Sequence, residues 1–341
     1  MRVLWTHNFD PGIPNNLVYI DTTAEAIRAR GVDLQIEYLG NLRSILQLFR
    51  ARARVRRLAP EFDLVHAQYG SVCALVTAAA DGVPKVLTVR GSDWNTYKSS
   101  FGFSYLHTWL ASRFTRAAIG SYDCVVSVSR RVAAGMARFA PDAHMTVLPS
   151  PIDLARFVPC DKKEAKALLG FPDCSEKWVL FNALSLQNPI KRFDLAKQAF
   201  DIAQARHGNL RLRLATDLPH DALPLFTASC DLIVCTSENE GWPNSIKEAL
   251  ACNVPFVSTD VSDLRDIAGN EPSCRICPPD AQVIADNICD VLAGPESRGL
   301  RQYVLGMSLD VAGERLISAY ESVLERYRRS DRLPSANSRH G

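Results

Sequence analysis

The stretch SENEGWPNSIKEALACNVPFVSTD, residues 237–260, decides the fold of this chain. The apolar run at 231–235 before it is typical of a short buried strand. Helix-start residues at 243–245, followed by apolar residues at helical spacing from Ile246, predict a helix. Residues 255–259 then predict a second strand. Strand, loop, helix and strand in this order form the parallel crossover unit of an open α/β sheet.

The start of the predicted helix is a candidate anion site. The first turn of a helix has unpaired N–H groups and the positive end of the helix dipole. In open parallel sheets this end faces the carboxyl edge of the strands, where ligands bind. Glu240 lies in the loop ahead of the helix, and Glu248 lies about one turn inside it. Two flanking carboxylates suit a diphosphate that has hydroxyl groups on both sides, such as a nucleotide-sugar.

Glu248 has a second interpretation. Ser245 followed three residues later by Glu248 fits a capping box, in which the carboxylate only satisfies a backbone N–H group. The flanking sequence favours the ligand interpretation. The run EGWPNSIKEALA at 240–251 resembles the E-x7-E signature of retaining nucleotide-sugar glycosyltransferases of the GT-B fold, family 4, and NVPFVSTD at 253–260 extends the resemblance.

The resemblance implies roles for the residues of this motif. Glu248 is expected to hold the ribose hydroxyls of the donor, and Glu240 to lie near the sugar ring. Gly241, Asn244 and Ser245 are expected to bind the donor at the helix start.

The resemblance extends to the loop before another predicted helix, 193–206. Lys191 matches a lysine that relatives carry there, and it is expected to neutralise the donor diphosphate. The arginine that usually precedes it is missing, and Arg192 stands where relatives have glycine. We expect Arg192 to replace part of the missing charge. For both residues the alternative is a solvated charge at a helix start.

Two positions in the first half complete the candidate site. Gly12 stands in the first loop, where relatives place a glycine close to the ligand. Arg90 follows a predicted strand at a place where many relatives carry histidine. At the carboxyl end of a strand it could contact a phosphate or an anionic acceptor, or else form a surface salt bridge. Ser150-Pro151 also departs from the usual Asn-Gly of the interdomain passage.

The length of 341 residues allows two domains, each with its own core. Strands and helices alternate throughout residues 1–150 and 151–310, which predicts parallel, doubly wound sheets. With the resemblance, this predicts the GT-B fold: two Rossmann-like domains that face each other across a cleft. A helix at 311–327 is expected to pack back on the first domain, and the polar tail 328–341 to be disordered.

Composition and missing motifs exclude several classes. No G-x-G-x-x-G follows the first strand, and no P-loop motif is present. The net charge of +2 argues against a general nucleic-acid binder. No apolar run approaches the ~20 residues of a membrane span, and no signal peptide precedes the first strand. The ten cysteines are scattered, and the Cys274–Cys277 pair has no second pair to complete a zinc site. These patterns predict a cytoplasmic protein with free thiols.

One segment suggests a lipid surface. Residues 42–58 are predicted to be helical and hold six arginines, no acidic residue and several apolar residues. Basic amphipathic helices of this kind dock on anionic lipid. The alternative is a solvated basic face whose apolar residues pack on the domain core.

The expected reaction is transfer of a sugar, with retention, from a UDP- or GDP-sugar to a saccharide or lipid-linked acceptor, in cell-surface polysaccharide or glycolipid synthesis. Glu240, Lys191 and Arg90 are the expected catalytic residues. No D-x-D motif occurs, so fixed positive groups are expected to replace a metal. A nucleotide-sugar epimerase or hydrolase of similar fold, and a non-catalytic partner subunit, remain as alternatives.

Overall fold

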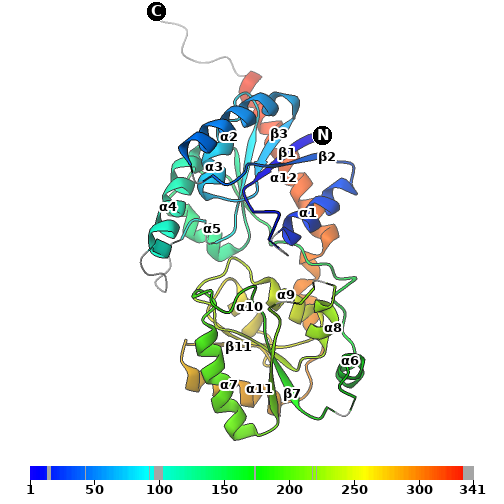
Figure 1. Ribbon diagram of the computed structural model, residues 1–341. Helices are drawn as coiled ribbons and strands as arrows, with labels where there is room; N and C mark the ends of the chain where they lie inside the picture. The colour runs from blue at the N-terminus through cyan, green and yellow to red at the C-terminus, as the bar shows by residue number, and fades with distance from the viewer. Residues whose placement is uncertain are drawn as a thin grey trace, which may run out of the picture. The chain divides into compact units, whose positions relative to one another are not determined.

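The computed structural model describes residues 1–13, 17–42, 44–91, 93–95, 103–172, 174–216, 218–219 and 221–332. The chain divides into two compact units, which Figure 1 shows. The first contains Met1–Asn95, Leu106–Pro149 and the residues from Asp310 onward. The second contains Ser150–Leu309.

The first unit is built on a six-stranded parallel sheet in the order β2-β1-β3-β4-β5-β6. Its strands are β1 (Arg2–His7), β2 (Asp33–Tyr38), β3 (Leu64–Ala67), β4 (Lys85–Val89), β5 (Cys124–Ser127) and β6 (Met145–Val147). The central strands are buried along nearly their whole length, as in β1 at Val3, Leu4 and Trp5. Continuous apolar strands of this kind need helices on both faces of the sheet.

Helices cover both faces of this first sheet (Figure 1). Buried residues of α2, α3, α4 and α5 share one hydrophobic cluster, and those of α1 and α12 share the other. The helices are α1 (Val18–Arg28), α2 (Ile45–Leu58), α3 (Ser71–Thr77), α4 (Phe103–Ala118), α5 (Arg130–Ala137) and α12 (Leu309–Arg332), with the short 3-10 segments η1 (Ala59–Glu61) and η2 (Ile119–Ser121).

The last helix belongs to the first unit. Tyr320 of α12 is fully buried there, and its hydroxyl accepts a hydrogen bond from Trp5 Nε1 at 2.9 Å. The same hydroxyl lies 2.6 Å from His66 Nδ1. The helix continues through Arg332, so the expected disordered tail does not begin at Arg328. The remaining residues of that predicted tail, 333–341, lie outside the described residues.

The second unit has a five-stranded parallel sheet in the order β11-β10-β9-β7-β8. Its strands are β7 (Lys177–Phe181), β8 (Leu210–Leu214), β9 (Leu232–Cys235), β10 (Phe256–Thr259) and β11 (Arg275–Cys277). Helices α8, α9 and α10 and segment η3 contribute to the cluster on one face, and α7 and α11 to the cluster on the other. The helices are α6 (Lys162–Leu168), α7 (Phe193–His207), α8 (Leu223–Ala228), α9 (Asn244–Ala251), α10 (Leu264–Ala268) and α11 (Ala281–Ala293), and η3 spans Leu300–Met307.

The basic segment predicted to be helical from Leu42 begins its helix at Ile45. Ser44 caps it, because its hydroxyl accepts a hydrogen bond from the Gln47 N–H group at 3.2 Å. Arg43, one of the six arginines counted there, lies outside the described residues. The only buried residues of α2 are Ala51 and Val55. Within the described residues, no helix is both long and apolar enough to span a bilayer.

Candidate active site

The loop between β9 and α9 has the geometry that the sequence predicts. Strand β9 is buried, and α9 begins at Asn244 directly after Pro243. Asn244 is exposed and Ser245 is half-buried, so the first turn of the helix is accessible. Pro243 occupies the N-cap position, and no side chain caps the helix. The capping box between Ser245 and Glu248 is therefore not formed, since Ser245 lies inside the helix and not at its N-cap.

Lys191 lies in direct contact with Glu240. The Lys191 ammonium donates a hydrogen bond to Glu240 Oε1 at 2.6 Å, and the Ser237 hydroxyl donates to the same oxygen at 2.8 Å. The side chains of Lys191 and Glu240 are 28% and 16% exposed. Burial alone would lower the pKa of Lys191, but the Glu240 carboxylate outweighs it and raises that pKa. The amine is therefore a cation at neutral pH, held on the loop that leads into α9.

Hydrogen bonds between two loops fix this contact. The Thr236 hydroxyl reaches the carbonyl oxygens of Lys191 and Arg192 at 2.8 and 2.9 Å. The Glu238 N–H group donates to the Ile190 carbonyl at 2.8 Å. The loop after β7 is thereby joined to the loop after β9, although the two are far apart in sequence. Sequence reasoning missed both Thr236 and Ser237, because neither hydroxyl stands at a motif position.

Glu248 extends from α9 toward the end of β7. Its Oε2 atom lies 3.5 Å from Asn182 Nδ2, a long hydrogen bond. Burial raises the pKa of Glu248 to about 7, against the opposing charge of Lys247. A carboxyl group with this pKa changes protonation near neutral pH. In its ionised form it can accept hydrogen bonds from two hydroxyl groups of a ligand.

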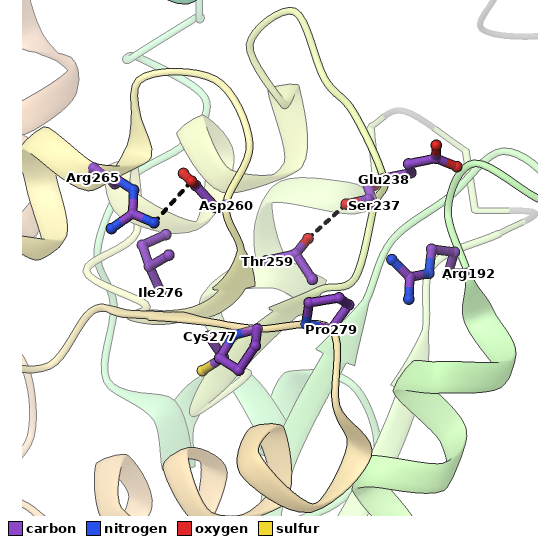
Figure 2. Close-up of a pocket in the computed structure, with 10 residues that line it drawn as sticks. Arg192, Ser237, Glu238, Thr259, Asp260, Arg265, Ile276, Cys277 and Pro279 are labelled. Atoms are coloured by element: carbon purple, nitrogen blue, oxygen red, sulfur yellow. Dashed lines mark hydrogen bonds and ion pairs between the residues drawn. The ribbon is translucent and has the colours of Figure 1, made fainter. Parts of the chain in front are cut away.

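Arg192, the residue after Lys191, occupies the N-cap position of α7. Its backbone is left-handed, with φ 52°, and its side chain lines a pocket of about 450 Å³ at the carboxyl edge of β9, β10 and β11 (Figure 2). In Figure 2 the guanidinium points toward Thr259 and Pro279. Glu240 and Lys191 do not line this pocket. The expectation that Arg192 replaces part of the missing charge on the diphosphate stays a prediction.

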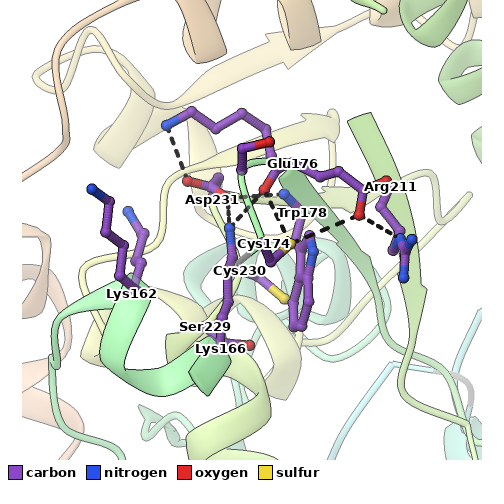
Figure 3. A network of polar contacts seen from close by, with 12 residues as sticks. Lys162, Lys166, Cys174, Glu176, Trp178, Arg211, Ser229, Cys230 and Asp231 are labelled. Atoms are coloured by element: carbon purple, nitrogen blue, oxygen red, sulfur yellow. Dashed lines mark hydrogen bonds and ion pairs between the residues drawn. The ribbon is translucent and has the colours of Figure 1, made fainter. Parts of the chain in front are cut away.

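A second polar cluster of this unit lies at the opposite edge of the sheet (Figure 3). Asp231, just before β9, pairs with Lys166 at 3.0 Å and Lys177 at 3.3 Å, and it accepts the Trp178 N–H group at 2.8 Å. The Asp231 and Lys166 side chains are each 6% exposed. This cluster ties α6 to β7 and β9 and is structural.

In the first unit, Arg90 lies at the carboxyl end of β4. Its guanidinium stacks on the Tyr19 ring at 3.8 Å from the centroid, and its Nε–H donates to the Gln68 carbonyl at 3.2 Å. Burial lowers the pKa of Arg90. The nearby Asp93 carboxylate is fully buried and accepts N–H groups of Gly70, Arg90 and Gly91 at 2.8–3.0 Å. Arg90 is thus a positioned cation and not a freely solvated one.

Aromatic side chains surround Arg90 at this edge. Phe9 contacts Tyr19 and Tyr69 edge-to-face, with centroid separations of 5.5 and 5.0 Å. Phe9 also stacks on His7 at 6.3 Å. Gly12, in the same loop as Phe9, is exposed, and its N–H group donates to Asp10 Oδ1 at 2.9 Å. This edge therefore offers flat aromatic surfaces next to one cation.

All ten cysteines are free thiols, including Cys274 and Cys277. Throughout the part of the chain that the structure describes, no three His, Cys, Asp or Glu side chains form a group that could hold a metal ion.

Comparison with known families gives a match in each unit. The family model described as Glycosyltransferase Family 4 matches residues 3–156, and the one described as Glycosyl transferases group 1 matches residues 192–302. A Bacillus subtilis relative is named as a candidate glycosyltransferase of teichuronic acid biosynthesis. It is 27% identical to this chain, over 76% of this chain and 68% of its own length. A 2-deoxystreptamine N-acetyl-D-glucosaminyltransferase of Streptomyces fradiae is 25% identical over 80% of this chain and 72% of its own.

Solved structures give matches along nearly the whole chain. A sucrose-phosphate synthase from Thermosynechococcus elongatus has a TM-score of 0.66 at 16% identity, covering 97% of this chain and 98% of that one. The Anabaena protein HepE, in complex with UDP and glucose, has a TM-score of 0.60 at 16% identity, with 97% and 99% covered. These likenesses show the fold, and the family matches show the class of enzyme. The chain is a glycosyltransferase of the GT-B fold.

Proposed function

We propose that the enzyme transfers a sugar from a nucleotide-diphosphate sugar to a hydroxyl group of a saccharide or lipid-linked acceptor, with retention of configuration. The observation that carries this proposal is the contact between Lys191 and Glu240 beside the start of α9. It supplies a fixed cation and a carboxylate next to unpaired helix N–H groups. Retention is taken from the resemblance of the motif to family 4.

The difficult step is departure of the nucleoside diphosphate. The Lys191 ammonium and the N–H groups at Asn244 and Ser245 would stabilise the charge that develops on its phosphate oxygens. Gly241 is buried in the loop just ahead of the helix, where its backbone would contact the donor. Groups that are already oriented need no reorganisation during the reaction, and their stabilisation is correspondingly large.

The two carboxylates would bind the hydroxyl groups at either end of the donor. Glu248 would accept hydrogen bonds from the ribose, since it lies inside the helix and faces Asn182 at the end of β7. Glu240 would contact the transferred sugar. Until the donor binds, the Lys191 contact neutralises the Glu240 charge, and the phosphate would then compete for the same ammonium. UDP is the first nucleotide to test, because it is bound in the matched HepE structure.

The first unit would supply the acceptor side. Sugar rings pack well on aromatic faces, which Phe9 and Tyr69 provide, and Gly12 lies in the same loop. Arg90 would recognise an anionic group of the acceptor or assist the leaving phosphate. The stacking of Arg90 on Tyr19 orients the guanidinium before any ligand arrives.

We infer that the transfer needs no metal ion, because the sequence has no D-x-D motif and Lys191 can neutralise the diphosphate. Full activity in excess EDTA is the expected result. A strict requirement for Mn²⁺ would contradict it.

We also propose that α2 docks the enzyme on anionic lipid at the cytoplasmic face of a membrane, where cell-surface polysaccharide or glycolipid precursors would be assembled. Three large apolar side chains of α2 are exposed: Ile45 at 73%, Leu46 at 59% and Phe49 at 67%. Arg50 and Arg57 are exposed on the same helix, while Arg54 pairs with Glu37 at 2.9 Å. Co-sedimentation with anionic liposomes should fall when Phe49, Arg50 and Arg57 are replaced by Ser; unchanged sedimentation would eliminate the proposal.

The reaction itself is tested by donor turnover with and without acceptors. A panel of UDP- and GDP-sugars is incubated alone, and then with saccharide and lipid-linked acceptors. Acceptor-dependent formation of a glycoside supports the proposal. Conversion or hydrolysis of the donor alone would indicate an epimerase or hydrolase. Tight nucleotide binding without any turnover would indicate a non-catalytic partner subunit.

A further inference from the structure

None of the proposed donor residues Lys191, Glu240 and Glu248 lines the pocket at the carboxyl edge of β9, β10 and β11. Figure 2 shows this pocket. Its volume of about 450 Å³ is within the range of small-molecule sites. Arg192 stands on one side of it, and the Asp260–Arg265 ion pair, 2.9 Å long, stands on the other. Ile276 and Pro279 contribute apolar surface between them. Charged groups on two sides of an apolar base are suited to a small polar organic ligand.

The two cations of the pocket differ in their partners. Arg265 is neutralised by Asp260. The Arg192 side chain makes no hydrogen bond or ion pair with any other residue that the structure describes. It is nevertheless only half-exposed, so part of its hydration is lost. A half-buried guanidinium without a carboxylate is best satisfied by an oxyanion, which can accept two parallel N–H bonds.

The backbone holds Arg192 in this position. Its left-handed conformation, φ 52° and ψ 52°, is uncommon for a residue with a side chain. The Thr236 hydroxyl donates to the carbonyl oxygens of Lys191 and Arg192 and so stabilises the turn. As a result, two adjacent cations serve different surroundings: Lys191 meets Glu240, and Arg192 faces the pocket.

We propose that this pocket binds a hydroxylated small molecule that carries one phosphate or carboxylate group, such as a sugar phosphate or a sugar acid. Its anionic group would form paired hydrogen bonds with Arg192. Its hydroxyl groups would donate to the carboxylate of Asp260, and its ring would lie on Ile276 and Pro279. A bare inorganic anion would leave most of the pocket unfilled, so the body of the ligand contributes to binding.

Calorimetric titration of the full chain tests this with four probes: glucose 6-phosphate, glucuronate, glucose and inorganic phosphate. Glucose 6-phosphate or glucuronate should bind more tightly than both glucose and inorganic phosphate, and the better of the two identifies the anionic group. Failure of both to bind would overturn the proposal. Binding of inorganic phosphate as tight as that of the sugar phosphate would also overturn it, because the pocket would then recognise no organic body.

Variants of Arg192 locate the binding site. Arg192→Gln should weaken binding of the preferred probe about 10- to 100-fold, the usual effect of losing hydrogen bonds to a charged group. Arg192→Lys keeps the charge but not the two parallel bonds, and its loss should be intermediate. Arg206→Gln is the matched control: Arg206 lies in α7, the helix that Arg192 precedes, pairs with Asp286 and does not line the pocket. Equal losses in Arg192→Gln and Arg206→Gln would contradict the proposal.

UDP binding separates this pocket from the donor site. Affinity for UDP should be unchanged in Arg192→Gln, and saturating UDP should not displace the bound probe. If Arg192→Gln weakens UDP binding as much as probe binding, or if UDP displaces the probe, Arg192 belongs to the diphosphate site and the pocket proposal is wrong. If the wild-type chain binds the probe but not UDP, the proposed donor site fails while the pocket stands.

Discussion

The five strands of the second sheet follow the order of the first five strands of the first sheet, but the two sheets carry different chemistry at their carboxyl edges. Strands β7 to β11 occupy the places that β1 to β5 occupy in the first unit. After β1 and β3 the first unit presents Phe9 and Tyr69, which contact each other through their rings. After the corresponding β7 and β9, the second presents Lys191 and Glu240, which form an ion pair.

The comparison shows that topology fixes where loops meet, and that the loop residues decide what the meeting place binds. In each unit the loop after the first strand meets the loop after the third. An aromatic meeting place suits a neutral ring, and a charged one beside a helix start suits a diphosphate. The proposed division into an acceptor side and a donor side rests on this difference.

The largest change in activity is expected at Lys191, in the carboxyl edge of the second sheet that carries the Lys191–Glu240 ion pair. Lys191→Ala should lower kcat about 10²- to 10³-fold, because one preorganised partner of the developing phosphate charge is lost. Initial rates at saturating donor measure this. Lys197→Ala is the control, since Lys197 pairs with Asp201 on the exposed side of α7, the helix that follows Lys191. A loss below tenfold in Lys191→Ala would remove the basis for assigning the donor to this edge.

The next prediction concerns the stability of the first unit around Asp93, whose carboxylate accepts the N–H groups of Gly70 and Arg90. A Cβ atom on Gly70 would lie 2.6 Å from Thr115 Oγ1 and 2.9 Å from Asp93 Oδ2, so Gly70→Ala should reduce the free energy of unfolding by about 1–3 kcal/mol. Denaturant titration measures the change. Gly120→Ala, where no atom lies within 4 Å of the added Cβ, should have a much smaller effect. Equal stability of the two variants would show that the close packing of Gly70 against Asp93 and Thr115 does not stabilise the first unit.

A third test concerns the protonation of Glu248, whose pKa burial raises to about 7. If the ribose binds the ionised carboxylate, affinity rises with pH up to that pKa and then levels off. UDP should therefore bind about tenfold more weakly at pH 6 than at pH 8 through this group alone. Titration of UDP itself contributes equally to Glu248→Gln, so the ratio between wild type and variant isolates the effect. A ratio independent of pH would contradict the ribose contact.

A smaller change in KM is expected at Arg90, the cation beside the aromatic residues of the first unit. Arg90→Lys keeps the charge but loses the planar stack on Tyr19, and the KM for the acceptor should rise roughly fivefold, or ~1 kcal/mol. The KM for the donor should not change. A rise in the donor KM alone would move Arg90 from the acceptor to the leaving phosphate.

The sequence predicted the β9–α9 unit closely, because buried strands and helix starts have strong local signals. It also placed Lys191 just before a helix, which the structure confirms with α7 beginning at Phe193. It could not predict that Lys191 meets Glu240 at 2.6 Å, since 49 residues separate them. It did not predict the left-handed backbone of Arg192, although the glycine that relatives carry at this position favours that conformation. The predicted last helix ended at residue 327, whereas α12 continues to Arg332. The charged residues in between are typical of a disordered tail, but they are also compatible with a helix.

The proposed donor site depends on Lys191, which would bind the diphosphate in the second unit. The most direct test compares binding of UDP and of uridine to the wild type and to Lys191→Ala. A loss of UDP affinity of tenfold or more, roughly 1.4 kcal/mol, with unchanged uridine affinity is the predicted result. Equal affinity of the two proteins for UDP, or an equal loss for both ligands, would contradict the claim.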